Sequence, residues 1–121
     1  MINIKDYVTF IVIYVAIDYI WLSRDLHKEN IYKIQKKELK LNLLAAGLFY
    51  LIAPLYFFYY IKPLSVSKFD ALKKGMLLGF LAYSTYDLTN KAVFEDYSWG
   101  YAISDIVWGT FVLGIVSYIM Y

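Results

Sequence analysis

The chain contains no cysteine, only two prolines among 121 residues, and only 18% charged residues. The absence of cysteine excludes disulfide bonds, thiolate metal sites and cysteine nucleophiles. Twelve lysines and arginines against ten aspartates and glutamates give a formal net charge of +2. That balance lacks the excess of positive charge typical of proteins that bind nucleic acid. No nucleic-acid partner is therefore expected.

Apolar side chains are abundant instead. Hydrophobic residues make up 61% of the chain and aromatic residues 21%, and the mean hydropathy is +0.51. Ordinary soluble domains contain roughly 45–50% apolar residues. A water-soluble protein of this length has too little interior to bury so much apolar surface. The composition therefore predicts an integral membrane protein whose main partner is the lipid bilayer.

Four apolar stretches are long enough, or nearly so, to cross the roughly 30 Å of hydrocarbon that takes about 20 residues. They cover residues 5–23, 41–61, 74–94 and 101–121. The second has no charged residue, and the fourth contains only Asp105. We therefore expect an all-α, multi-pass, four-helix transmembrane bundle that forms a single domain over residues 1–121.

The connection between the first two spans contains six basic residues. Loosely spaced Ile31, Ile34, Leu39 and Leu41 predict a short interfacial helix there. Seven basic residues fall on the side of the first and third connections, and five fall on the other side. The positive-inside rule favours a cytoplasmic first connection only narrowly. The orientation stays open, as does the choice between a bacterial inner membrane and a viral or host membrane.

Three aspartates, Asp18, Asp87 and Asp105, fall inside the expected spans. An ionisable residue in a span costs about 2.5–3.5 kcal/mol on insertion scales and usually faces a bundle interior or a water-filled cavity. Because successive spans alternate in direction, all three aspartates belong to the same leaflet. We therefore expect them to converge in one polar layer.

Other polar residues accompany these aspartates at helical spacing. Tyr14, Tyr83 and Tyr101 each precede an aspartate by four residues, so each phenol can reach that carboxylate or line the same cavity. Trp21 and Trp108 each follow one by three residues. The predicted site, which binds a small ligand, a cation or a proton, consists of Asp18, Asp87, Asp105, Tyr83, Asn90, Trp21 and Trp108.

Few cations are available to these carboxylates, and Lys91 and Arg24 are the nearest candidate partners. Three carboxylates with at most two cations cannot all stay ionised in a low-dielectric layer. The site must then share protons, bind a cation or open to water. The alternative reading is structural, because single polar side chains also join membrane helices, at about 0.6 kcal/mol each on average.

Three further residues or motifs receive structural readings. Gly75 and Gly79 form a GxxxG motif, which is expected to seat the third helix within its own bundle. Pro54 is expected to kink the second span. His27 has no second ligand at metal spacing, so a solvated histidine is expected. No metal site and no cofactor are predicted.

Four strings of residues carry a resemblance to a known family. They are Asp18-x-x-Trp21-Leu22, Phe49-Tyr50, Tyr83-Ser84-Thr85-Tyr86-Asp87-Leu88-Thr89-Asn90 and Asp105-x-x-Trp108-Gly109-Thr110. The chain resembles the small predicted membrane proteins of bacteria and some large DNA viruses known as domain of unknown function 2177. The resemblance implies four helices and a membrane location, and it supplies no established activity. Members typically have a Gly-Trp-Pro turn before the fourth span, where this chain has Tyr97 and Ser98.

Three functions follow as hypotheses. The first is binding of a small ligand, cation or proton by the aspartate cluster, as in a small transporter. The second is a membrane enzyme that acts on a lipid or isoprenoid-like substrate, which the absence of His and Cys from the spans, and of Lys from their central parts, disfavours. The third is a structural or assembly protein that forms homo-oligomers or joins a partner membrane protein.

Overall fold

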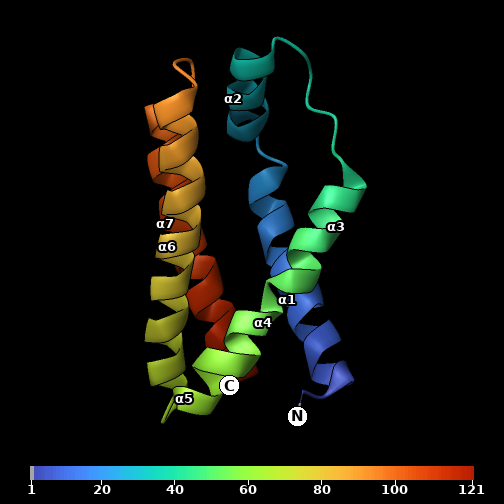
Figure 1. Cartoon of the computed structure of the whole chain (residues 1–121), viewed down its shortest axis with the longest axis vertical. Helices are drawn as coiled ribbons and strands as arrows, with labels where there is room; N and C mark the ends of the chain where they lie inside the picture. The colour runs from blue at the N-terminus through green and yellow to red at the C-terminus, as the bar shows by residue number, and fades with distance from the viewer. Residues whose placement is uncertain (1) are drawn as a thin grey trace.

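The computed structural model describes residues 2–121, and these residues form helices joined by loops, without a β-strand. The all-α class is therefore confirmed. Helices α6 and α7 pack side by side along their length, and α1 lies against α7. Helix α2 lies beyond the C-terminal end of α1 (Figure 1). The elements are α1 (Ile4–Leu22), α2 (Asp25–Gln35), α3 (Leu43–Ile52), α4 (Pro54–Tyr56), the π-helical η1 (Phe57–Ile61), α5 (Lys62–Leu64), α6 (Lys68–Val93) and α7 (Trp99–Met120).

Two helical segments are long and apolar enough to cross a membrane: the run Leu43–Leu64, which joins α3 to α5, and α7. A third candidate exists if α1 and α2, which are bent by 71° at residues 23–24, are counted as one span. Helix α6 is long enough but carries charged residues at both ends. Length and composition of the helices thus support two or three spans.

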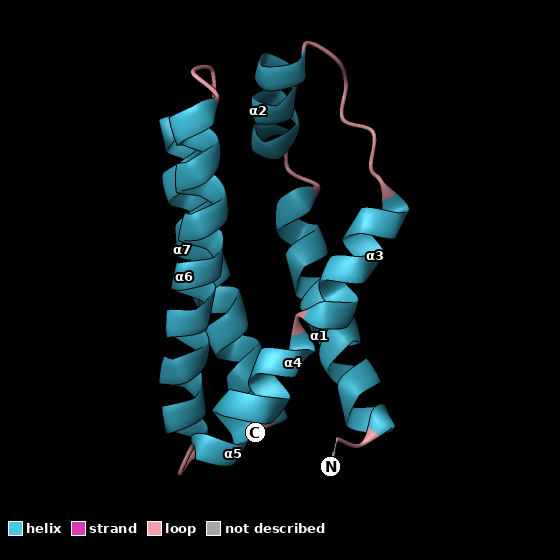
Figure 2. Cartoon of the chain, viewed as in Figure 1, coloured by secondary structure: helices cyan, strands magenta, loops and turns pink. Residues whose placement is uncertain are grey.

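The connection between α1 and α3 contains one helix, as expected, but in a different place. Helix α2 covers Ile31 and Ile34 and ends where Lys36 adopts a left-handed conformation with φ 58°. Leu39 and Leu41 lie in the non-helical linker 36–42, which runs from α2 to the start of α3 (Figure 2). The expectation that they extend the helix was wrong, because a left-handed residue ends a helix.

Pro54 interrupts the second helical run. Helix α3 ends at Ile52, Ala53 forms a turn, and Pro54 is the first residue of α4. Proline has no backbone N–H to continue the helical ladder, and its ring crowds the preceding turn. The run then loosens into the π-helical η1 before Pro63 in α5. The expected break at Pro54 is therefore present.

Glycine brings α6 and α7 into backbone contact. A Cβ atom placed on Gly79 would clash with the backbone of Gly109 and lie 2.9 Å from Thr110 Cα. A Cβ atom on Gly75 would lie 2.7 Å from the Cβ of Ser117. The GxxxG motif thus seats α6 against α7 within the chain, which is the arrangement that its sequence suggests.

On α1 and α6, the helical face that packs inside the protein also contains the aspartate. On α1 the buried side chains are Phe10, Tyr14 and Asp18, spaced four residues apart. On α6 the same spacing joins Gly79 to Asp87 through the partly buried Tyr83. Because residues four apart share a helical face, packing of the apolar face also directs these aspartates inward.

Candidate functional site: a buried carboxyl cluster

Asp18 lies where four helical segments meet. Its Oδ2 atom accepts a hydrogen bond from Tyr50 on α3 at 2.5 Å, and its Oδ1 atom accepts one from Trp108 Nε1 on α7 at 2.9 Å. Tyr83 on α6 donates a longer bond of 3.4 Å to the same Oδ1. The side chain is buried, with 3% of its surface exposed. One carboxylate thus joins α1 to three other helices.

Asp105 on α7 is bonded in the same way as Asp18, by a tryptophan from the opposite helix. Its Oδ1 atom accepts a hydrogen bond from Trp21 Nε1 on α1 at 2.7 Å. The indole that follows each aspartate by three residues therefore donates to the aspartate of the other helix. The two indoles stack, with ring centroids 5.4 Å apart and an interplanar angle of 13°. The two Asp-x-x-Trp strings form crossed pairs that hold α1 against α7.

Asp87 on α6 is fully buried and adjoins Asp105. Its Oδ1 atom accepts a hydrogen bond from Tyr97 at 2.5 Å, and its Oδ2 atom has no hydrogen-bond partner. Asp87 and Asp105 are close enough for their carboxyl groups to interact. Two ionised carboxylates have no donor to share, so a hydrogen bond between them requires that one of them holds a proton.

The cations expected to pair with these carboxylates point elsewhere. Lys91 Nζ donates to the backbone oxygen of Glu95 at 2.8 Å, and the Arg24 guanidinium lies 5.7 Å from the Trp21 ring centroid. Within residues 2–121 the salt bridges lie outside the cluster: Lys36–Asp96 and Lys74–Asp70. The expectation that Lys91 and Arg24 are ionic partners was wrong, because Lys91 bonds to the Glu95 carbonyl and Arg24 lies over the Trp21 ring.

The tyrosines bond between helices rather than along them. Tyr14 and Tyr83 share a hydrogen bond of 2.7 Å between their hydroxyl groups, and Tyr83 continues to Asp18 on α1. Tyr101 bonds to His27 at 2.7 Å. In the part of the chain that the structure describes, none of them bonds to the aspartate four residues ahead. Tyr101 does line the same cavity as Asp105, which was the other expected outcome. Tyr83 lines this cavity as well, but Asp87, the aspartate four residues ahead of it, does not.

This cavity has a volume of about 490 Å³ and opens between α1, α3, α6, α7 and the linker 36–42. Asp18 and Asp105 line it, with the phenols of Tyr50, Tyr83 and Tyr101. Apolar residues form much of the remaining wall: Leu22, Leu39, Leu41, Ala45, Ala46, Phe49 and Ala82. Convergent polar groups in an apolar cavity are typical of small-molecule sites.

The remaining predicted residues surround the cavity without lining it. Trp21 and Trp108 hold the aspartates from behind through their indole N–H groups. Asn90 is partly buried and lies within hydrogen-bonding reach of Tyr86 and Tyr97. Asp87 does not line the cavity itself and lies behind Asp105, which does. The structure thus brings all seven predicted residues into one contiguous region.

Residues that the sequence reasoning missed belong to the same region. Tyr50 and Tyr97 donate to Asp18 and Asp87, respectively. Among fourteen tyrosines in the chain, these two were noted only through the family resemblance, Tyr50 in the Phe49-Tyr50 string and Tyr97 at the turn before the fourth span, and neither was assigned to the site. Asn30 on α2 accepts a hydrogen bond from the backbone N–H of Ser98 at 2.8 Å, so α2 is docked onto the start of α7.

His27 is part of the cavity wall, and the expectation of a solvated histidine was wrong. Docking of α2 leaves the side chain partly buried and places Nδ1 2.7 Å from Tyr101 Oη. Burial lowers the pKa of His27 below its usual value, against the opposing attraction of the Asp105 and Asp18 charges. The folded state therefore favours the neutral imidazole.

A pH dependence follows from this imidazole. His27 takes up a proton more easily in the unfolded chain than in the folded protein. Its contribution to the stability of the fold is therefore complete above about pH 6.5 and is lost as the pH falls from there through the lowered pKa. We expect the melting temperature in detergent to fall between about pH 6.5 and pH 5. The decline should be shallower in His27→Gln, which offers polar atoms to Tyr101 but does not titrate. Equal slopes for the two proteins would contradict this role of His27.

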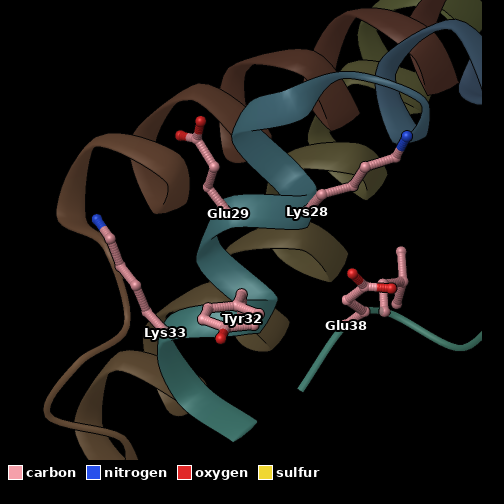
Figure 3. A pocket seen from close by; sticks show the side chains of 6 residues that line it. Lys28, Glu29, Tyr32, Lys33 and Glu38 are labelled. Atoms are coloured by element: carbon pink, nitrogen blue, oxygen red, sulfur yellow. The ribbon is translucent and has the colours of Figure 1, made fainter. Parts of the chain in front are cut away.

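A separate hollow of about 610 Å³ lies on the outer face of α2 and the linker. Figure 3 shows its labelled side chains, in which Lys28 and Lys33 point in different directions and away from a common centre. Lysines alternate there with Glu29 and Glu38. This hollow lacks converging groups, so the cavity at the carboxyl cluster is the candidate functional site.

No three His, Asp or Glu side chains in the described residues come close enough together to hold a metal ion. The cluster is instead a group of hydrogen-bonded carboxyl groups. Asp87 and Asp105 are neighbours, and Asp18 is connected to Asp105 through the stacked indoles of Trp108 and Trp21. Its chemistry is that of oxygen acceptors and exchangeable protons.

The fold and the cluster define a helical membrane protein with polar groups buried between its helices. The chain matches the family model described as Predicted membrane protein (DUF2177) over residues 3–121, and it belongs to this family. No curated protein and no solved structure matches it. The family gives a membrane location and leaves the activity to be inferred from the site.

Proposed function

We propose that the chain crosses the bilayer four times, through α1, the run 43–64, the later part of α6, and α7. Support comes from the packing of α6 along α7, since α7 is itself long and apolar enough to span. A helix in contact with a span over its whole length lies at the same depth. Apart from Asp87, the charged side chains of α6 lie near its ends, where lysines can extend to the headgroups: Lys68, Asp70, Lys73, Lys74 and Lys91.

We infer that the carboxyl cluster is an intramembrane binding site for a small ligand, a cation or a proton. The observation that supports it most is the presence of Asp18 and Asp105 in the wall of the 490 Å³ cavity without a cation paired to either in the described chain. Buried charges are normally paired or neutralised. The missing counterpart is then a proton or a bound ligand.

The residues divide into distinct roles in this proposal. Asp18 receives three donors and serves as a fixed negative charge. Asp105 receives one indole donor and faces the cavity, so it is the group that contacts the ligand. Asp87 shares a proton with Asp105, while Trp21 and Trp108 position the two cavity aspartates. Tyr83 and Asn90 shape the site.

A shared proton couples binding to proton release. When a ligand with a single positive charge reaches Asp105, the proton between Asp105 and Asp87 becomes unfavourable and leaves, so that one positive charge replaces another. Release on one side of the membrane and uptake on the other would make the protein a small proton-coupled transporter. The same exchange without a change of access would make it a binding protein.

Infrared spectroscopy tests the shared proton. At neutral pH the wild-type protein should show the C=O stretch of a protonated carboxylic acid, which responds to deuterium exchange slowly because the group is buried. Asp87→Asn and Asp105→Asn should each remove the band, since an amide N–H then donates to the remaining carboxylate. Asp96→Asn, at an exposed position, is the matched control and should retain it. Persistence of the band in both cluster variants would contradict the proposal.

A membrane enzyme that acts on a lipid or isoprenoid-like substrate is the second candidate, and an apolar groove of about 550 Å³ beside the cavity favours it. In that case the proton of the Asp87–Asp105 pair would be donated and Asp18 would accept one. Incubation of the purified protein with labelled lipid, followed by mass analysis of the lipid, distinguishes conversion from binding. An unchanged lipid that co-purifies in an Asp105-dependent manner supports binding alone.

A further inference from the structure

We propose that the cavity and the adjoining groove together bind one amphiphilic lipid with a phosphoethanolamine-type head. The cavity at the carboxyl cluster and the apolar groove share Phe49 and Ala82 as wall residues. One molecule can therefore place a polar group among the carboxylates and an attached chain in the groove. This inference rests on the proposed function of the carboxyl cluster and names its ligand class.

The groove has the lining that an acyl chain requires. Tyr14, Ile52, Leu55, Leu78 and Leu113 are among the residues that form it. Its volume of about 550 Å³ falls in the range of roughly 300–1,000 Å³ that ligand pockets occupy. A hydrocarbon chain there is in contact with apolar side chains on α3, α4, α6 and α7.

The groove exists because α3 stands away from α6. Helix α3 has no buried residue, and it packs against α1 and α4 rather than against α6 or α7. Figure 2 shows α3 diverging from α6 toward the linker end. Phe49 and Ile52, which line the groove from α3, therefore remain exposed, and a lipid chain in the groove would cover apolar surface that the protein does not cover itself.

The charges of the cavity match a zwitterionic head. Asp18 and Asp105 are buried in its wall, and Lys40, which is exposed, lines it from the linker. His27 also lines it and is neutral for the reasons given above. A phosphoethanolamine head has an ammonium group for the carboxylates and a phosphate for Lys40. The ammonium N–H groups also supply donors to Asp105, which accepts a hydrogen bond only from Trp21 among the described residues.

The chemistry of the head distinguishes this ligand from other lipids. A glycerol head offers hydroxyl donors but no positive charge, so the two cavity carboxylates would stay uncompensated. A choline head carries the charge, but its trimethylammonium group has no N–H to donate and is larger. We therefore expect the order ethanolamine, then choline, then glycerol.

Native mass spectrometry of the detergent-purified protein tests this order with three lysophospholipids that share one acyl chain and differ only in the ethanolamine, choline or glycerol head. We expect the ethanolamine lipid to bind at least about tenfold more tightly than the glycerol lipid, the size of one charge-assisted hydrogen bond. Free phosphoethanolamine, which lacks the chain, should bind too weakly to detect. An equal or reversed preference between ethanolamine and glycerol would overturn the inference.

Matched variants separate the head from the chain. Asp105→Asn should abolish the preference for ethanolamine, whereas Asp6→Asn, on α1 and outside the cavity, should preserve it. Ala82→Phe places a ring where the cavity and groove join, and should weaken all three lipids by a similar factor. Ala92→Phe, also exposed on α6 but outside both walls, is its control and should have no effect.

The outcomes also distinguish this inference from the function on which it rests. If free phosphoethanolamine binds as tightly as the lysolipid and binding depends on Asp105, the carboxyl site stands and the lipid is wrong. If lipid binding does not depend on Asp105 for any head, both the lipid assignment and the proposed ligand contact at Asp105 fail.

Discussion

Replacing Gly79 with alanine is expected to separate α6 from α7 and to destabilise the protein by about 1–3 kcal/mol, the usual cost of overpacking an interior. The new Cβ atom would meet the backbone of Gly109 and Thr110 rather than the end of a flexible side chain. Backbone atoms in a helix cannot move without shifting the whole helix, so the contact has no inexpensive relaxation. Thermal unfolding in detergent, followed by circular dichroism, measures the loss.

Gly47 provides the control for this substitution. It lies in α3, and no atom beyond its local helix lies within 4 Å of a Cβ placed there. Gly47→Ala should therefore leave stability unchanged or raise it, since alanine favours the helix by about 1 kcal/mol over glycine. Similar melting temperatures for Gly79→Ala and Gly47→Ala would show that α6 and α7 do not make the close contact.

Removing the Asp18 carboxylate is expected to have the other large effect. Asp18→Ala leaves Tyr50 and Trp108 without their acceptor and removes the longer bond of Tyr83, which keeps Tyr14 as a partner. Each buried unpaired donor costs about 1–3 kcal/mol. Because the three donors come from α3, α6 and α7, the loss should loosen the bundle as a whole. The melting temperature and the resistance to limited proteolysis should both fall.

Two further variants serve as controls for Asp18→Ala. Asp18→Asn keeps one oxygen acceptor but adds N–H donors opposite another donor, so its melting temperature should lie between those of the wild type and Asp18→Ala. Asp96→Ala removes an exposed carboxylate in a surface salt bridge and should change stability by less than about 1 kcal/mol. A wild-type melting temperature for Asp18→Ala would mean that the crossed hydrogen bonds contribute little to the fold.

The crossed Asp–Trp pairs connect this stability with the proposed binding. Trp21 and Trp108 donate to carboxylates that line the cavity, so the same bonds that join α1 to α7 also fix the position of the ligand groups. Movement of α1 relative to α7 would change both pairs together. The site and the helix interface are therefore one structural unit.

Much of this arrangement could be predicted from the order of the residues. Charge-free or nearly charge-free runs at 41–61 and 101–121 predicted the helical segments that the structure has at 43–64 and 99–120. The i, i+4 spacing placed Asp18 on the face that Phe10 and Tyr14 bury. The convergence of three aspartates followed from the alternating direction of the helices. The GxxxG motif placed Gly75 and Gly79 in a helix contact.

The hydrogen-bond partners could not be predicted in the same way. Spacing along a helix suggested Tyr83 as a partner of Asp87. In the structure Tyr83 donates a hydrogen bond to Asp18, and Asp87 accepts one from Tyr97. His27 reads as a solvated residue in a charged connection until α2 is docked against Tyr101. These contacts depend on how helices rotate and approach, which no single segment encodes.

The sequence by itself determined the helices, the membrane location and the presence of acidic groups at one level, because hydrophobicity and helical periodicity are local properties of the chain. Only the tertiary structure decided that Asp18 and Asp105 are crossed with tryptophans, that both line a cavity without a paired cation, and that α3 leaves an apolar groove beside it. The physical reason is that a buried polar group takes whichever donor the packing brings within about 3 Å. That donor comes from another helix, at a distance in sequence that only the folded bundle sets.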